Sequence, residues 1–566
     1  MTSLKAMILK TVSKPELLLI FLLQAIVIFI NSDFIPIWDS TIYIQNCIQP
    51  AITANNFIIK HFSCFGHTSY AFVLLITAVL YFTKLRFYNV HYLIGFFYIL
   101  STRCFYKILC FYVNEKKYRV EIFLATLIYA FCPLIWALVF NFNLDIGVLF
   151  FSILFFYSLI YQKKWQSLFY SIFLIFSKGN GICVFVAILF WYSLSEFFKM
   201  RTSYRTFYKD KGTLFNIKHI VNNFFYRFYP LILPVALLIW DYIYISSTKK
   251  YVGGWDSLVS NSFSLSSIFN ILLSFNFNDP YLKSFLANIF ILNFNWLLWG
   301  IIIFLLLIKI KIKNREKIKS VILHDYFFLL AILLSMVYIT TRILTFSNPR
   351  YVSVVSPFLI LVFSLSIILF TKKRLIRIFV LSGFVILNFC SNIWTIDPLS
   401  KKIYGTFEYG NHTMLNMTKI SGECCGSGRD QLVYNMQYLF LQKLVYKLYT
   451  HFLEIHNYAT TITGDPIFTS IHALGAFHFS LNIRRKLVLW NGTLSDMNWE
   501  LPMYAGIKDL EKVLNMGNKK SFYYLSYPNY INDDNETLTY LNKKYHLKST
   551  KVFENYGYTS TLYNFN

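Results

Sequence analysis

The chain has 566 residues, of which 56% are hydrophobic, 20% are aromatic and only 14% are charged. Its mean hydropathy of +0.49 is far from the soluble norm and excludes an ordinary globular enzyme. The formal net charge of +26 comes mostly from short loops between apolar runs. Such loops are typical of the cytoplasmic face of a membrane protein, so nucleic-acid binding is not expected.

Apolar runs long enough to cross about 30 Å of hydrocarbon recur from residue 17 to residue 394. The first run has no small-residue cleavage site after it, so we interpret it as an uncleaved span and not as a signal peptide. The pattern predicts a mainly α-helical polytopic membrane protein with about eleven spans. Their ranges are 17–31, 90–113, 122–140, 146–161, 166–177, 181–197, 220–245, 285–308, 321–341, 351–370 and 376–394.

The short run from Tyr70 to Phe82 is interpreted from the charge balance of the loops. If it lies along the membrane surface, the cytoplasmic loops hold 24 Lys and Arg and the opposite face holds nine. If it crosses, the balance becomes 11 inside against 22 outside, which contradicts the positive-inside rule. We therefore predict an interfacial helix in a long first outer loop, residues 32–89. This choice leaves Arg103 and Lys107 inside a span, where a cation should face protein or water.

The last part of the chain is different in character. From residue 395 onward no spanning run occurs, and 17 Lys and Arg nearly balance 14 Asp and Glu. This predicts a transmembrane domain over 1–394 and a soluble α/β domain over 395–566. The predicted topology places the second domain on the outer side. In agreement, this domain holds all four Asn-x-Ser/Thr sequences, at Asn411, Asn416, Asn491 and Asn535.

Several polar residues share the outer face in this topology. Some have a plain interpretation: Asp145 as a helix N-cap, Lys178 as a lysine that reaches the interface, and Arg350 as a headgroup anchor. His67 can be an ordinary loop histidine. Their placement on one side of the membrane nevertheless predicts a common pocket. The candidate residues are Asp39, Tyr43, His67, Asp145, Lys178, Arg350 and Tyr351.

The order of these elements resembles that of the C-type glycosyltransferase superfamily, in the branch of protein O-mannosyltransferases and lipid A aminoarabinose transferases. The resemblance rests on an acid after the first span, a histidine before the interfacial helix, an acid opening the fourth span, a Lys-Gly turn after the fifth, and "RYVSVVSPFLIL" at a late span. Two departures occur. Asp39 is followed by Ser40 where many relatives have a second acid, and His67 is followed by Thr-Ser in place of Pro-Pro.

The resemblance implies transfer of a sugar from a polyprenyl-phosphate donor to a lipid, glycan or protein acceptor. Asp39 is then the base that takes the proton of the acceptor hydroxyl. Lys178 and Arg350 meet the charge of the leaving phosphate. Asp145 orients the acceptor or, together with Asp39, holds a Mg or Mn ion. His67, Tyr351 and Tyr43 are further contacts.

The sequence excludes some functions and leaves others open. No Asp-x-Asp, Walker loop, Gly-x-Ser-x-Gly or His-Glu-x-x-His motif occurs, so no nucleotide cofactor is expected. A transporter or flippase of lipid-linked sugars stays open as the alternative function, and so does a membrane scaffold without catalysis. A bacterial inner membrane and an endoplasmic reticulum membrane both suit the chain, with the carboxyl-terminal domain on the periplasmic or lumenal side and membrane lipids as neighbours.

Overall fold

A computed structural model describes most of the predicted spans and part of the tail. The described residues belong to two compact units, one mostly helical and one built on a sheet. The described ranges are 14–32, 70–83, 88–140, 144–207, 228–248, 280–312, 320–343, 349–409, 412–416, 454–455, 458, 461–462, 467–470, 487–490, 504–505, 521–526, 534–555 and 558–566.

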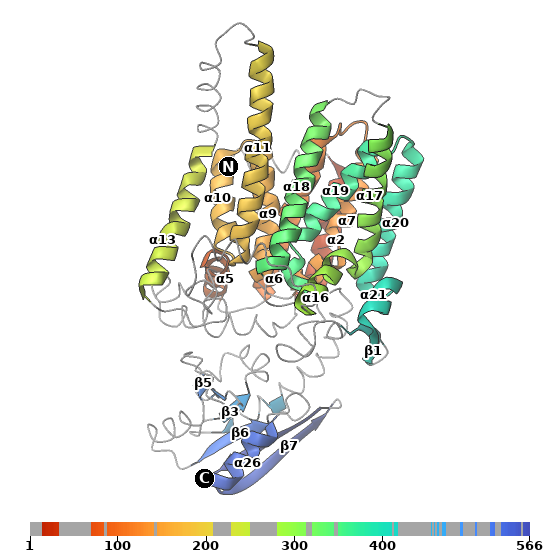
Figure 1. Cartoon of the computed structure of the whole chain (residues 1–566). Helices are drawn as coiled ribbons and strands as arrows, with labels where there is room; N and C mark the ends of the chain where they lie inside the picture. The colour runs from red at the N-terminus through yellow and green to blue at the C-terminus, as the bar shows by residue number, and fades with distance from the viewer. Residues whose placement is uncertain are drawn as a thin grey trace. The chain divides into compact units, whose positions relative to one another are not determined.

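Most helices of the first unit lie within a few residues of the predicted spans, and most of them run side by side (Figure 1). An exception is α13, which begins at Ile232 and ends at Thr248, whereas the predicted span covers 220–245. Five described helices are long and apolar enough to cross a membrane, or six if one bent pair is a single span, and four shorter apolar helices accompany them. The count of eleven spans therefore stays a prediction. The helices are α2 (Pro15–Ile30), α5 (Tyr70–Phe82), α6 (Tyr88–Tyr112), α7 (Arg119–Ala130), α8 (Pro133–Phe140), α9 (Leu144–Ile160), α10 (Lys164–Ile175), α11 (Asn180–Phe207), α13 (Ile232–Thr248), α16 (Pro280–Phe290), α17 (Asn295–Ile312), α18 (Ser320–Ile343), α19 (Val355–Phe370), α20 (Arg374–Ile393) and α21 (Pro398–Tyr404), with short 3-10 turns η2 (Tyr229–Leu231), η3 (Leu292–Phe294) and η4 (Pro349–Val352).

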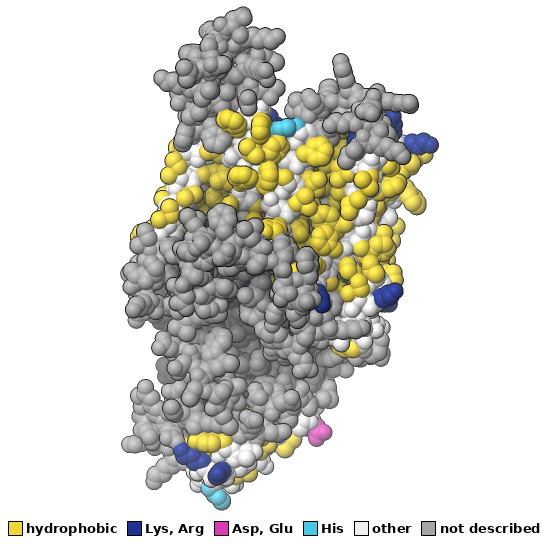
Figure 2. All heavy atoms as spheres, in the orientation of Figure 1, with side chains coloured by type: hydrophobic (Ala, Val, Ile, Leu, Met, Phe, Trp, Pro, Cys, Tyr) yellow, Lys and Arg dark blue, Asp and Glu magenta, His cyan; other side chains and the backbone are white. Residues whose placement is uncertain are grey.

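Two of these helices form the centre of the first unit. Every residue of α9 is buried, and so are the residues of α19 from Val355 to Ile368. An α-helix that is apolar on all sides is stable only when other helices surround it. The peripheral helices instead expose large apolar side chains, such as Phe29 of α2, Phe304 of α17 and Phe379 of α20. Figure 2 shows hydrophobic side chains covering one face of the helical unit, as expected for a surface in contact with lipid.

The predicted helix over 70–82 is confirmed as α5. The backbone amide of Ala71, in its first turn, donates to the carbonyl oxygen of Phe176 at 3.1 Å. Phe72 is fully buried and packs edge to face on Phe151 of α9. Gly147 permits this approach, because a Cβ atom there would lie 3.0 Å from the Phe72 ring. The amino end of α5 is therefore fixed against α9 and the end of α10, while its place at a membrane surface stays a prediction.

The span predicted over 122–140 is wrong as one helix, because α7 and α8 meet at a bend of 47°. Pro133 opens α8 and cannot donate the backbone hydrogen bond that a continuous helix needs. Side chains take over the carbonyl groups left at the end of α7. Tyr98 donates to Ala130, Asn388 donates to Ile128 at 3.0 Å, and Asn392 donates to Phe131 at 2.8 Å. These bonds keep the bend free of unpaired carbonyl groups where water is scarce.

The span predicted over 285–308 is also broken, into α16 and α17 with η3 between them. Asn293 and Phe294 have positive φ angles of 53° and 65°, which end the helical path. The buried carboxylate of Asp397 accepts from the backbone amide of Phe294 at 2.9 Å and from the indole of Trp296 at 3.1 Å. Asp397 is also the N-cap of α21, where it accepts from Leu399 at 3.1 Å. One side chain thus joins the broken span to α21.

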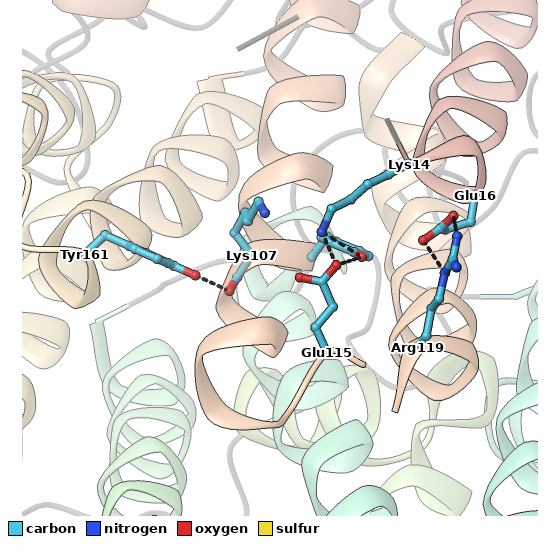
Figure 3. A network of polar contacts seen from close by, with 7 residues as sticks. Lys14, Glu16, Lys107, Glu115, Arg119 and Tyr161 are labelled. Carbon is cyan, nitrogen blue, oxygen red and sulfur yellow. Dashed lines mark hydrogen bonds and ion pairs between the residues drawn. The ribbon is translucent and has the colours of Figure 1, made fainter. Parts of the chain in front are cut away.

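Ion pairs hold together the end of the helical unit where α2 begins and α6 finishes (Figure 3). Lys14 pairs with Glu115, which lies between α6 and α7. Glu16 of α2 accepts two hydrogen bonds from Arg119 of α7, at 2.9 and 2.7 Å. The two pairs fasten the start of α2 to the turn after α6 and to the start of α7.

The second unit contains a mixed sheet with the strand order β5-β4-β3-β6-β8-β7. Strands β3 to β6 pair in parallel where they touch, whereas β8 is antiparallel to both β6 and β7. Phe522, Tyr524 and Phe565 of the sheet form a core with Leu541 of α26 (Asp534–Lys544). The sheet predicted for the tail is therefore present. Its strands are β3 (Ile467–Ser470), β4 (Leu487–Trp490), β5 (Tyr504–Ala505), β6 (Phe522–Ser526), β7 (Leu547–Asn555) and β8 (Tyr558–Phe565).

A separate hairpin of β1 (Thr406–Tyr409) and β2 (His412–Leu415) follows α21 and belongs to the helical unit. That unit therefore continues beyond residue 394, the last residue of the predicted transmembrane domain.

Candidate active site

A buried carboxylate lies at the start of the central helix α9. Asp145 is only 2% exposed and occupies the first turn of this helix. A negative charge is favoured there, because the first backbone amides of a helix point toward it and the helix dipole is positive at this end. Asp145 is the second residue of α9, which begins at Leu144, so it is not the N-cap suggested by the sequence. Its place in the first turn does not explain the cations that surround the carboxylate.

The first cation is Lys178, in the turn between α10 and α11. Its side-chain nitrogen lies 2.8 Å from Asp145 Oδ2, and the side chain is almost fully buried. The turn depends on Gly181, because a Cβ atom there would lie 2.0 Å from the carbonyl oxygen of Leu174. Asn180, in the same turn, donates a long hydrogen bond of 3.4 Å to the other oxygen, Oδ1. The glycine therefore lets the turn fold tightly enough to bring a lysine and an amide to one carboxylate.

The second cation is Arg350, in η4 just before the other central helix, α19. Its Nε atom lies 3.9 Å from Asp145 Oδ2, and its side chain is only 7% exposed. Arg350 also donates to the hydroxyl of Tyr351 at 2.9 Å. The Tyr351 ring lies 4.3 Å from the Lys178 nitrogen and 4.9 Å from the Arg350 guanidinium carbon. The ring thus contacts both cations and holds them close together.

The charge of this cluster is positive as a whole. One carboxylate faces two cations, all three are buried, and like charges in a site of low dielectric repel strongly. An anion that entered beside Lys178 and Arg350 would relieve that repulsion. Arg350 offers a planar group suited to two phosphate oxygens, and Lys178 offers a compact charge. The arrangement is therefore suited to binding a phosphate group.

The described residues fit a divalent cation less well. Both oxygens of Asp145 already face Lys178, Arg350 or Asn180, and a metal ion there would meet two positive charges. Within the described part of the chain, no group of three His, Cys, Asp or Glu side chains could hold a metal ion. The metal site predicted from Asp39 and Asp145 stays a prediction, because Asp39 lies outside the described residues.

The structure brings together four of the seven residues predicted for the pocket: Asp145, Lys178, Arg350 and Tyr351. They come from three separate stretches of chain, at the first turn of α9, between α10 and α11, and before α19. The remaining three, Asp39, Tyr43 and His67, lie outside the described residues.

Sequence reasoning assigned no role to Asn180. Asn180 lies in the Lys-Gly-Asn-Gly sequence, two residues after the predicted site residue Lys178. That proximity could have predicted a place in the site. A small, mainly apolar cavity begins at Asn180 and runs between α11 and α18. Its other lining residues are Cys183, Val184, Met336, Ile339, Thr340 and Val354.

Comparison with known proteins gives a result for structure and none for sequence. No protein-family model and no curated protein matches the chain. Two crystal structures of ArnT from Cupriavidus metallidurans do match. The apo structure has a TM-score of 0.56, and the structure bound to undecaprenyl phosphate has a TM-score of 0.54. Each comparison covers 96% of this chain and 97% of the other chain, at 10% sequence identity.

The chain has the fold of ArnT. The resemblance to the lipid A aminoarabinose transferase branch is thereby confirmed at the level of the fold. At 10% identity the ArnT likeness says nothing about individual residues. The roles of the buried carboxylate and its two cations must therefore be argued from their own geometry.

Proposed function

We propose that the chain is a membrane glycosyltransferase that moves a sugar from a polyprenyl-phosphate donor to a lipid, glycan or protein acceptor. The observation that carries this proposal is the convergence of Lys178 and Arg350 on the buried carboxylate of Asp145. The ArnT fold supports the same conclusion, since one of the matching structures holds undecaprenyl phosphate.

The two cations act on the leaving group in this proposal. When the bond between the sugar and the phosphate breaks, negative charge grows on the phosphate oxygens. Lys178 and Arg350 stabilise that charge from fixed positions, because packing and the Tyr351 ring already hold them in place. Asp145 balances the two cations before the donor binds.

The acceptor needs a base, and Asp39 remains our candidate for it. Asp145 is less suited to this role, because its two oxygens already face Lys178 and Asn180 and are not open to an acceptor hydroxyl. We propose that Asp145 orients the cations and the acceptor, with His67, Tyr43 and Tyr351 as further contacts. The reaction takes place at the outer face of a bacterial inner membrane or an endoplasmic reticulum membrane.

Reconstituted protein tests the proposal directly. Full-length protein in vesicles is given radiolabelled polyprenyl-phosphate sugars together with a membrane extract as the source of acceptor. We expect labelled product from the wild type and at least about 100-fold less from Lys178→Gln, the loss typical of removing one group that stabilises transition-state charge.

A matched control comes from the other end of α11. Lys199 forms an ion pair with Asp325 at 2.7 Å, so Lys199→Gln removes a similar pair away from Asp145. This control should retain near-normal transfer. Labelled lipid that crosses the vesicle membrane without any sugar transfer would instead identify the chain as a transporter or flippase.

A further inference from the structure

Helix α6 carries two cations on its open face. Arg103 and Lys107 are four residues apart and so lie on the same side of the helix. Both are partly exposed, in line with the exposed rings of Phe96 and Phe111, whereas Cys104 between them is buried. The open stripe of α6 therefore carries two cations between the exposed aromatic rings of Phe96 and Phe111.

The depth of these cations is unusual for a membrane helix. At 1.5 Å per residue, Lys107 lies roughly 7 Å from the carboxyl end of α6, and Arg103 roughly 14 Å. The Lys107 side chain can reach the membrane interface from a depth of roughly 7 Å. Burying the Arg103 guanidinium roughly 14 Å deep costs free energy unless an anion or water contacts it. A cation in this position marks a binding site by default.

Two further lysines lie in the same neighbourhood. Tyr161 donates to the backbone oxygen of Lys107 at 2.9 Å, which brings the turn after α9 against this part of α6. Lys163, in that turn, donates to the hydroxyl of Tyr157 of α9 at 2.9 Å and lies 4.9 Å from the centre of its ring. Lys14 is close enough to act on Lys107 as a like charge, and Figure 3 shows the two side by side.

The acid nearest to this group is already engaged. Glu115 pairs with Lys14 and accepts from the Tyr106 hydroxyl at 3.1 Å. Burial raises the pKa of Glu115, but these hydrogen bonds outweigh burial and hold the pKa below its usual value, so the carboxylate is ionised. Among the described residues, no carboxylate forms an ion pair with Arg103, Lys107 or Lys163. An anion bound from outside the protein could therefore pair with Arg103 and Lys107.

We propose that the open stripe of α6 binds the phosphate headgroup of an anionic phospholipid. The Arg103 guanidinium is placed to take two phosphate oxygens, Lys107 and Lys163 add positive charge nearer the surface, and the acyl chains follow the apolar stripe toward Phe96. The site is distinct from the Asp145 cluster, which consists of Asp145, Lys178, Arg350 and Tyr351. That cluster lies at the opposite end of α9, about 25 Å away along the helix. It does not depend on the proposed transfer reaction.

Native mass spectrometry of the full chain tests the lipid site. Protein released from nanodiscs of equimolar phosphatidylglycerol and phosphatidylcholine should retain phosphatidylglycerol selectively. Each of Arg103→Gln and Lys107→Gln should weaken retention about fivefold, the effect of about 1 kcal/mol per cation. Arg103→Lys keeps the charge but loses the second hydrogen bond to phosphate, so it should weaken retention less than Arg103→Gln does. Lys309→Gln, at the end of α17, is the control and should retain lipid as the wild type does.

Several outcomes would overturn the proposal. Equal retention of the two lipids by the wild type would do so without any variant, which matters if Arg103→Gln fails to fold. Undiminished retention by a folded Lys107→Gln protein would also do so. Displacement of the bound lipid by millimolar inorganic phosphate would show that the stripe binds free phosphate and not a lipid. None of these measurements depends on sugar transfer.

Discussion

Asp145 is the residue on which the candidate site depends, because its charge offsets two buried cations. Lys178 lies 2.8 Å from one of its oxygens and Arg350 lies 3.9 Å from the same oxygen. A buried ion pair contributes little net stability when intact, but removal of one partner leaves the other charge uncompensated. The same residue therefore links the stability of the empty site to the binding of an anion.

Asp145→Asn should reveal that link. The substitution keeps the size of the side chain but leaves two buried cations that repel each other, at a cost of about 3–5 kcal/mol. A polyprenyl phosphate should restore more stability to the variant than it adds to the wild type, because its phosphate replaces the missing charge. Thermal unfolding of the purified proteins, with and without polyprenyl phosphate, measures both effects.

Asp325→Asn is the control for this experiment. Asp325 pairs with Lys199 at 2.7 Å away from Asp145, so its loss should also lower the unfolding temperature. Polyprenyl phosphate should give this variant no more than the wild-type gain. If both variants gained equally, the phosphate would not be binding at the Asp145 cluster.

Residue types and their order predicted the Asp145 cluster, because each member follows or opens an apolar span on one side of the membrane.

The structural role of Asp397 was not predicted, although an Asp followed by Pro398 is a recognisable helix start. Its second role, at Phe294 and Trp296, joins positions about a hundred residues apart. No local pattern carries that information, because the contact exists only once α16, α17 and α21 have packed.

At the scale of elements, hydropathy predicted where helices lie but not where they break. The run over 122–140 is apolar throughout, and Pro133 marked its bend only weakly, since prolines are tolerated in membrane helices. The second break, at Asn293, has no proline at all. Tertiary contacts permit both breaks, because side chains from elsewhere in the chain form hydrogen bonds with the backbone N–H and C=O groups that the breaks leave open.

The bend between α7 and α8 should therefore weaken when its partners are removed. Asn392→Leu deletes the amide that donates to Phe131 at 2.8 Å and leaves that carbonyl oxygen unpaired in an apolar setting. We expect a loss of about 0.6–1.7 kcal/mol, the range for hydrogen bonds between membrane helices. Unfolding in mixed micelles measures this loss. Ile386→Leu, on the exposed side of the same helix, is the control and should have no effect.

The first unit carries polar groups at both ends of its buried central helix α9. The Asp145 cluster lies at one end of α9, and Lys163 follows the other end. The charge balance of the loops predicts that the Lys163 end faces the cytoplasm and that the first unit holds an odd number of spans. The sheet-containing tail should then lie on the same side of the membrane as the Asp145 cluster.

Reporter fusions decide this orientation. Alkaline phosphatase fused after Asn566 should be active, because the enzyme matures only outside the cytoplasm, and a green fluorescent protein fused there should stay dark. Fusion within the loop 309–319, which is predicted to be cytoplasmic, should give the opposite pair of signals. A fluorescent carboxyl-terminal fusion would place the tail in the cytoplasm. The run from Tyr70 to Phe82 would then have to cross the membrane, and the predicted outer pocket would lose its basis.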